Sequence, residues 1–213
     1  MEVLGKLFGS EHKVRIMRLF LFNPETPFAK EDVAERARVT LASARRELKI
    51  LRKTRLIKSR YFVKRIVKRG GARARLSRKK FGGLIINSAF TYLAELERLL
   101  LDSSLLKGDE LLRRLNKIGK VQLVLIAGVF LQDTDSRVDL LVVGEHLRRG
   151  ALQKVIEGLE AEIGKELRYA AFETGEFNYR LGMYDKLVRD ILDYPHTVVL
   201  DRLGLPPMSA ERR

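Results

Sequence analysis

The first third of the chain alternates short helical patterns with turn residues. One helix is predicted after the N-cap Ser10 and ends at Asn23-Pro24, because the residue before a proline disfavours the helical conformation. A second helix is predicted over 29–37, and a third runs from the N-cap Thr40 to about Thr54. The apolar stripe of the first helix comprises Val14, Met17, Phe20 and Leu21.

The third predicted helix has two unlike faces. Apolar residues at three- and four-residue spacing turn one side toward a core, while small and cationic residues share the opposite side. Such a helix suits a groove, with its cationic side facing the partner. The apolar face comprises Leu41, Ala44, Leu48 and Leu51, and the cationic face comprises Ala42, Ser43, Arg46, Lys49 and Lys53.

A basic hairpin is predicted after this helix. Strands are expected over 56–68 and 72–81, with a turn at Gly70-Gly71 between them, and Gly82-Gly83 is expected to close the hairpin. Three short helices followed by a two-stranded hairpin are typical of a winged helix-turn-helix, in which the third helix enters the major groove of DNA.

The charge of the chain gathers in the same segment. The 213 residues carry a net charge of +15, with 42 Lys and Arg against 27 Asp and Glu. From Arg36 to Lys80 there are nineteen Lys or Arg and a single acid, Glu47, so this segment carries +18 and the remaining residues sum to −3. A polyanion is the natural partner of such a segment, since each phosphate neutralised releases counterions. The alternative is a solvated basic face on a ribosomal or membrane-surface protein.

Double-stranded DNA is therefore the expected partner. Arg46 and Ser43 are candidates for base edges, because Arg can bond two acceptors of guanine and a hydroxyl can donate or accept. A phosphate contact is the alternative for Arg46. Lys49, Lys53 and the cations of the hairpin are expected to contact phosphates. The predicted interface comprises Thr40, Ala42, Ser43, Arg45, Arg46, Lys49, Lys53, Arg69, Arg73 and Arg75.

The second half of the chain predicts an α/β region. A linker helix over 89–101 can pack on its own domain or pair with a second copy, and another helix is expected over 108–118. The sheet strands that follow are expected to be covered by helices. Strands are predicted over 121–127, 138–143, 167–172 and 197–200, and helices over 149–163 and 183–192.

A family resemblance lies in this half. The segments 125–130 and 136–144 resemble a minimal nucleotidyltransferase-like domain, and residues 84–90 upstream are similar to winged-helix regulators to which that domain is often fused. The resemblance implies a Gly-Ser pair for nucleotide phosphates and an Asp-x-Asp pair for two metals. This chain has Gly128-Val129 and Arg137-Val138-Asp139 at those positions.

Both departures affect the chemistry that the family would perform. A two-metal mechanism needs converging carboxylates, and Arg137 places a cation where a cation would bind. We therefore expect Asp139 to be a vestigial metal position with no catalytic or metal site, and Arg137 to pair with Asp139 or Asp135. An active site built on Asp133 and Asp135, in the preceding loop, is the alternative.

The numbers of Cys and His residues exclude several classes of chemistry. The chain has no Cys and three scattered His, which leaves no thiolate chemistry and no histidine cluster, and it fits a reducing cytoplasm. No signal peptide, membrane span or cofactor is expected. The domains expected are a winged helix over 1–83, linker helices over 84–118, a nucleotidyltransferase-like domain over 119–205 and a tail over 206–213.

The function expected is that of a homodimeric transcriptional regulator that binds double-stranded DNA sequence-specifically. The second domain would mediate association or sense an effector that the sequence does not identify. Two alternatives stay open: an active nucleotidyltransferase acting on protein or RNA, and an RNA-binding or antitoxin-like partner protein.

Overall fold

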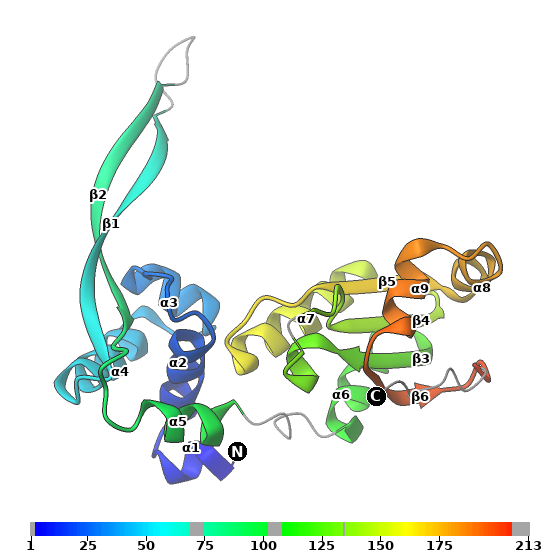
Figure 1. Cartoon of the computed structure of the whole chain (residues 1–213), viewed down its shortest axis with the longest axis horizontal. Coiled ribbons are helices and arrows are strands. Elements are labelled where there is room, and N and C mark those ends of the chain that lie inside the picture. The colour runs from blue at the N-terminus through cyan, green and yellow to red at the C-terminus, as the bar shows by residue number, and fades with distance from the viewer. Residues whose placement is uncertain (1–2, 69–74, 102–107, 134, 206–213) are drawn as a thin grey trace. The chain divides into compact units, whose positions relative to one another are not determined.

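The computed structural model describes residues 3–68, 75–101, 108–133 and 135–205, apart from the side chains of residues 64–80. Two compact units are present, Met1–Asp102 with Glu160–Lys165, and Ser103–Leu159 with Glu166–Arg213. Helices and two separate sheets make up a mixed α+β architecture, as the sequence predicts at that level (Figure 1). None of the described helices is both long and apolar enough to cross a bilayer.

The helices of the first unit surround one apolar core. The three helices predicted here are confirmed as α2 (Glu11–Phe22), α3 (Lys30–Arg36) and α4 (Leu41–Lys53), and a short helix α1 (Val3–Leu7) precedes them unpredicted. The Ser10 side chain caps α2 by accepting a hydrogen bond from the backbone N–H of Lys13. The core includes Val14, Met17, Phe20, Val33, Ala44, Leu48 and Leu51.

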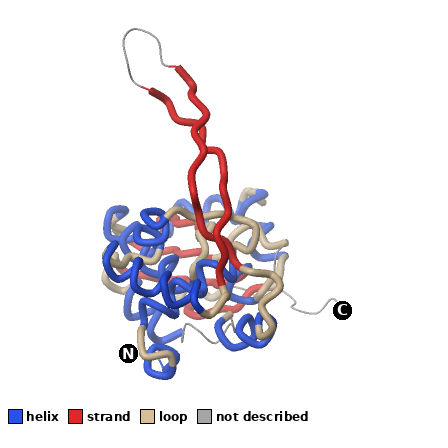
Figure 2. Tube along the Cα trace, turned by 90° about the vertical axis from the view of Figure 1, so that its left-hand side faces the viewer, coloured by secondary structure: helices blue, strands red, loops and turns tan. Residues whose placement is uncertain are grey.

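The hairpin consists of β1 (Ile57–Lys68) and β2 (Arg75–Ile86). The two strands pair antiparallel along their whole length, from Ile57 opposite Ile86 to Lys68 opposite Arg75. They run side by side as a twisted ribbon that leaves the helices at its base (Figure 2). The predicted turn at Gly70-Gly71 lies outside the described residues.

The expectation that Gly82-Gly83 closes the hairpin is wrong, because β2 continues through both glycines to Ile86. A Cβ on Gly83 would overlap the ring of Phe62, so the missing side chain makes room for an aromatic residue of β1. The backbone of the next residue, Leu84, exchanges two hydrogen bonds with Phe28, at 2.9 and 2.8 Å. These bonds join the base of the hairpin to the segment before α3.

The linker helix packs on its own unit, one of the two arrangements that the sequence allows. It is shorter than predicted, α5 (Leu93–Leu100), and Leu100 belongs to the core of the first unit. The buried guanidinium of Arg18 in α2 donates to the Leu100 carbonyl at 2.9 Å. Leu93 and Leu96 of α5 pack against the same core, whereas Leu99 is exposed.

The second unit is built on a four-stranded sheet of order β5-β4-β3-β6. β4 pairs antiparallel with β3 and parallel with β5, and β6 pairs antiparallel with β3. β4 is buried at five consecutive positions, as expected of a central strand covered on both faces. The strands are β3 (Lys120–Ala127), β4 (Leu140–Glu145), β5 (Tyr169–Glu173) and β6 (His196–Asp201).

The helices of this unit agree in part with the predictions. α6 (Gly108–Leu115) ends three residues early, and α7 (Arg149–Ile163) has the predicted bounds. α8 (Thr174–Gly182) was not predicted, because its Thr, Asn and two Gly are poor helix formers and mask its pattern. α9 (Lys186–Asp193) begins three residues after the predicted start, at the N-cap Asp185.

Candidate functional site

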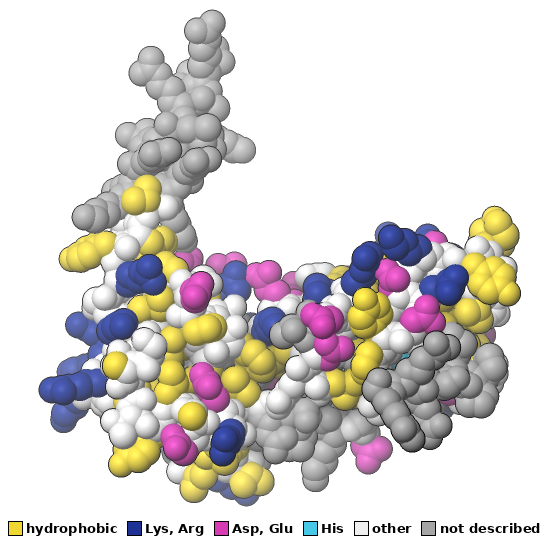
Figure 3. Space-filling view, in the orientation of Figure 1, with side chains coloured by type: hydrophobic (Ala, Val, Ile, Leu, Met, Phe, Trp, Pro, Cys, Tyr) yellow, Lys and Arg dark blue, Asp and Glu magenta, His cyan; other side chains and the backbone are white. Residues whose placement is uncertain are grey.

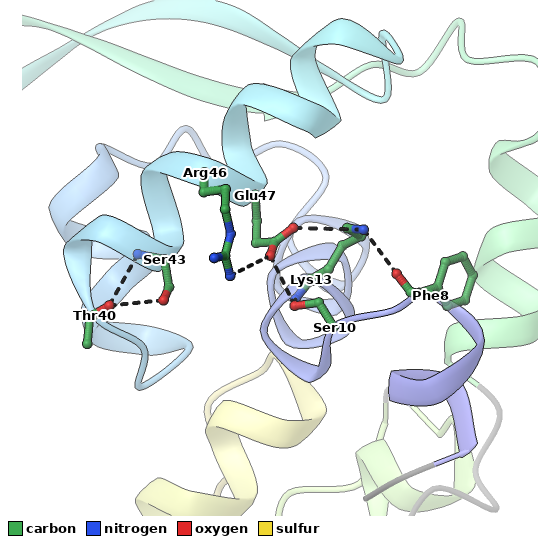
Figure 4. A network of polar contacts seen from close by, with 7 residues as sticks. All are labelled: Phe8, Ser10, Lys13, Thr40, Ser43, Arg46 and Glu47. Atoms are coloured by element: carbon green, nitrogen blue, oxygen red, sulfur yellow. Dashed lines mark hydrogen bonds and ion pairs between the residues drawn. The ribbon is translucent and has the colours of Figure 1, made fainter.

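The start of α4 is shaped by two hydroxyl groups. Thr40 is the N-cap, and its Oγ1 accepts a hydrogen bond from the backbone N–H of Ser43 at 3.2 Å. The same hydroxyl donates to Oγ of Ser43 at 3.0 Å, so the two predicted contact residues hold each other in place (Figure 4). The hydroxyl proton of Ser43 is not used in this contact, and Ser43 can therefore still donate to a ligand. Ala42 beside it is exposed.

Glu47, the single acid of the basic segment, points into the unit. Its side chain is 3% exposed, and its Oε1 accepts a hydrogen bond from the Ser10 hydroxyl at 3.0 Å. The ammonium of Lys13 lies 3.9 Å from Oε2 and also donates to the Phe8 carbonyl at 3.0 Å (Figure 4). This network attaches the inner face of α4 to the start of α2, and it removes the only negative charge from the outer face.

Arg46 lies at the border of these two faces. Its Nη2 is 3.4 Å from Oε1 of Glu47, while 67% of its side chain is exposed. One end of the guanidinium is therefore oriented by a buried carboxylate. The remaining N–H groups face solvent, which is the arrangement that a planar donor needs to bond an outside acceptor in two places.

The other cations of α4 are exposed. Arg45, Lys49, Arg52 and Lys53 make no hydrogen bond or ion pair through their side chains with the described part of the chain. Lys and Arg side chains gather over α4 in the space-filling view (Figure 3). Of the predicted residues at the start of α4 and along it, Thr40, Ala42, Arg45, Arg46, Lys49 and Lys53 are exposed, and Ser43 is half-buried.

The hairpin residues of the predicted interface are described less fully. Arg69 and Arg73 lie outside the described residues, and Arg75 begins β2 without a described side chain. The register of the strands is nevertheless informative, because it pairs positions of like charge. Three such pairs are Lys64 with Lys79, Arg65 with Arg78, and Lys68 with Arg75. Like charges at directly opposed positions destabilise a hairpin unless an anion neutralises them.

Two cations that the sequence did not single out, Lys30 and Arg52, line a pocket on this unit together with Arg45, Lys49 and Lys53. The spacing of the four α4 residues could have indicated their common surface, since residues three and four apart are neighbours on a helix. Lys30 belongs to α3 and carries no comparable signal, because its position depends on how α3 packs against α4.

In the second unit, Asp139 holds three segments of chain together. Its carboxylate is 3% exposed, and it accepts hydrogen bonds from the backbone N–H groups of Val129 at 2.9 Å and Arg168 at 2.8 Å. The guanidinium of Arg168 adds two longer contacts at 3.3 Å. Gly128 has a φ of +52°, and a Cβ there would overlap Oδ1 of Asp139. The carboxylate therefore ties the 3-10 turn Gly128–Leu131, labelled η2, to the start of β5.

The expected pairing of Arg137 is wrong. Arg137 contacts Asp190 of α9 at 3.1 Å, whereas Arg168 is the cation beside Asp139. Asp139 is buried and already approached by the residue before β5, while Arg137 stays largely exposed and extends toward α9 instead. Asp135 is joined to Asp133 by its own backbone N–H, at 2.9 Å from Oδ1.

Glu173, the last residue of β5, is a second carboxylate engaged by the backbone. Its two oxygens each accept a hydrogen bond of 3.0 Å, from the N–H groups of His146 and Leu147. Within the described ranges, no three His, Asp or Glu side chains come together in a way that could hold a metal ion.

Comparisons of the chain with protein-family models, with curated proteins and with solved structures found no match.

Proposed function

We propose that the protein is a transcriptional regulator that binds double-stranded DNA through a winged helix-turn-helix formed by α2, α3, α4 and the β1-β2 hairpin. The observation that carries the proposal is the outer face of α4. It presents Arg45, Arg46, Lys49 and Lys53 to solvent, while Glu47 is buried among partners on the inner face. A helix of this kind can enter the major groove, where its cations meet phosphates and base edges.

Different parts of α4 would perform different tasks. Arg46 and Ser43, near the N-terminal half of the helix, are held by neighbouring groups and retain unused donors for base edges. Lys49 and Lys53 lie one and two turns further on, and they would neutralise backbone phosphates without reading sequence. This division assigns specificity to the oriented residues and affinity to the long, flexible ones.

The hairpin supports the same proposal. Each strand has 12 residues, which corresponds to roughly 40 Å of extended chain. A ribbon of this length with paired like charges gains stability from a polyanion laid along it, and the phosphate backbone beside the groove is such a partner. Base-specific contacts are not needed for this role.

The second unit would serve association or effector sensing, and we propose that it performs no nucleotide transfer. The carboxylate of Asp139 accepts hydrogen bonds from two backbone N–H groups and contacts the Arg168 guanidinium, so it is poorly placed to ligate a metal. Homodimerisation stays a prediction, because Leu93, Leu96 and Leu100 of α5 pack on the core of their own unit.

Selection of bound fragments from sheared genomic DNA tests the proposed function and yields the site at the same time. The full-length protein should enrich fragments that share a short sequence, and a chain carrying Arg46→Ala should enrich a broader set. Structured RNA is added as a competitor in a parallel selection. Enrichment of no common sequence, or loss of the DNA to RNA, would overturn the proposal.

A further inference from the structure

A pocket on the first unit combines a cationic rim with an apolar base. Its volume is about 480 Å³, and its lining includes the buried side chains of Leu48 and Leu84. The other lining residues are exposed cations from two helices, and no Asp or Glu is among the described residues that line it. These cations are Lys30, Arg45, Lys49, Arg52 and Lys53.

Five positive charges lie close together in this pocket. None of the five side chains forms a hydrogen bond or ion pair with the described residues, so no described partner offsets their mutual repulsion. Four of them extend from α4, and Lys30 approaches from the start of α3. Unpaired cations that converge on one hollow create a positive potential, which concentrates anions there.

The composition of the rim favours phosphate among the common anions. A single carboxylate would neutralise only one of five charges, whereas linked phosphates carry several charges within a few ångströms. Arg offers a planar fork of donors that matches phosphate oxygens, and Lys adds a point charge that can follow them. A volume of about 480 Å³ falls in the range of small-molecule sites and exceeds the need of one phosphate group.

We propose that this pocket is a phosphate-binding site that accepts more than one phosphate group, with Lys30 and Arg52 as residues specific to it. Two sources share this chemistry, the backbone of bound DNA and a free polyphosphate. The site shares Arg45, Lys49 and Lys53 with the proposed DNA interface, but the cationic lining of the pocket supports it independently of the proposed function.

The experiment compares the full-length protein with the double variant Lys30→Ala/Arg52→Ala. Its matched control is Lys117→Ala/Lys154→Ala, which removes two exposed cations of the second unit and leaves the pocket intact. Inorganic triphosphate is titrated by calorimetry without DNA in the first arm. In the second arm, the salt dependence of duplex binding is measured for the same three proteins.

Binding of triphosphate that weakens about tenfold or more in the pocket variant and less than twofold in the control supports the site and identifies a free polyphosphate as a ligand. A salt slope that falls by about two in the pocket variant alone supports the site and identifies DNA backbone as the source. If neither quantity depends on Lys30 and Arg52, the inference is overturned.

The two proposals fail separately in this design. Triphosphate binding by a protein that does not bind duplex DNA would retain the pocket and reject the proposed function. Duplex DNA binding by a protein whose triphosphate and duplex binding are both unchanged in the pocket variant would retain the proposed function and reject the pocket. Thermal unfolding of the three proteins confirms that the substitutions leave the fold intact, as expected of exposed side chains.

Discussion

Ser10 and Glu47 connect the start of α2 to the middle of α4. The Ser10 hydroxyl accepts the backbone N–H of Lys13 at 3.1 Å and donates its own proton to Oε1 of Glu47 at 3.0 Å. One side chain thus completes a helix cap and donates a hydrogen bond to a buried carboxylate. This pair, together with the buried Leu48 and Leu51, holds the inner face of α4 against the unit, so its cationic face points outward.

Replacing Glu47 with Ala should destabilise the first unit. The substitution removes the acceptor of the Ser10 hydroxyl and the partner of Lys13, and we expect the free energy of unfolding to fall by about 1–3 kcal/mol. Urea denaturation measures this change. Glu35→Ala is the matched control, since Glu35 is an exposed acid of α3, and its effect should stay within about 0.5 kcal/mol. Equal effects of the two substitutions would contradict the role given to Glu47.

Gly128 should not tolerate a side chain. Alanine at this position would adopt a left-handed conformation at φ +52° and would overlap Oδ1 of Asp139, so unfolding should become easier by at least about 2 kcal/mol. Gly158→Ala in the middle of α7 is the opposite case, because a Cβ there meets no atom within 4 Å. That control should stabilise the protein by about 0.5–1 kcal/mol. A neutral Gly128→Ala variant in thermal unfolding would refute this account of the turn.

Arg46 and Lys53 should differ in what they contribute to DNA binding. Arg46→Ala should weaken binding to the selected site by about 1–3 kcal/mol and leave binding to random duplex nearly unchanged. Lys53→Ala should weaken both by a similar factor and lower the salt slope by about one. Fluorescence anisotropy with the two duplexes measures these quantities, and Lys154→Ala serves as the control. Similar losses of discrimination in both variants would mean that Arg46 contacts phosphate only.

The second unit should not transfer nucleotides. Incubation of the full-length protein with labelled ATP or CTP, magnesium and candidate protein or RNA acceptors should give no incorporation above background. The physical reason is that Asp139 is held by Arg168 and by two backbone N–H groups. Incorporation that disappears in the Asp139→Asn variant would establish the transferase alternative.

Periodicity in the sequence was a good guide to helices and a poorer guide to contacts. The stripe of Leu48 and Leu51 in α4 is buried as predicted, because helical spacing alone decides which side chains share a face. The prediction of a turn at Gly83 was wrong, because a glycine is required there by the close approach of the Phe62 ring and not by a turn. The partner of Asp139 could not be predicted, since Arg168 comes next to it only when β4 and β5 pair in parallel.

In the candidate site too, features within one element could be predicted and contacts between elements could not. Residues within one element, such as Arg46 and Lys49, were found from the wheel of α4 alone. Lys30 was missed, because its place in the pocket depends on the packing of α3 against α4, and so was the buried role of Glu47. Contacts between elements carry no local signature that a single sequence displays.

A duplex titration at several salt concentrations tests the central claim most directly. If α4 and the hairpin engage six to ten phosphates, the affinity of the full-length protein for duplex DNA should fall by about 10³–10⁵ between about 50 and 200 mM salt. A selected site should also be bound more tightly than random duplex at every concentration. Weak binding that is indifferent to salt would contradict the claim that the cationic face of α4 and its hairpin form a DNA-binding surface.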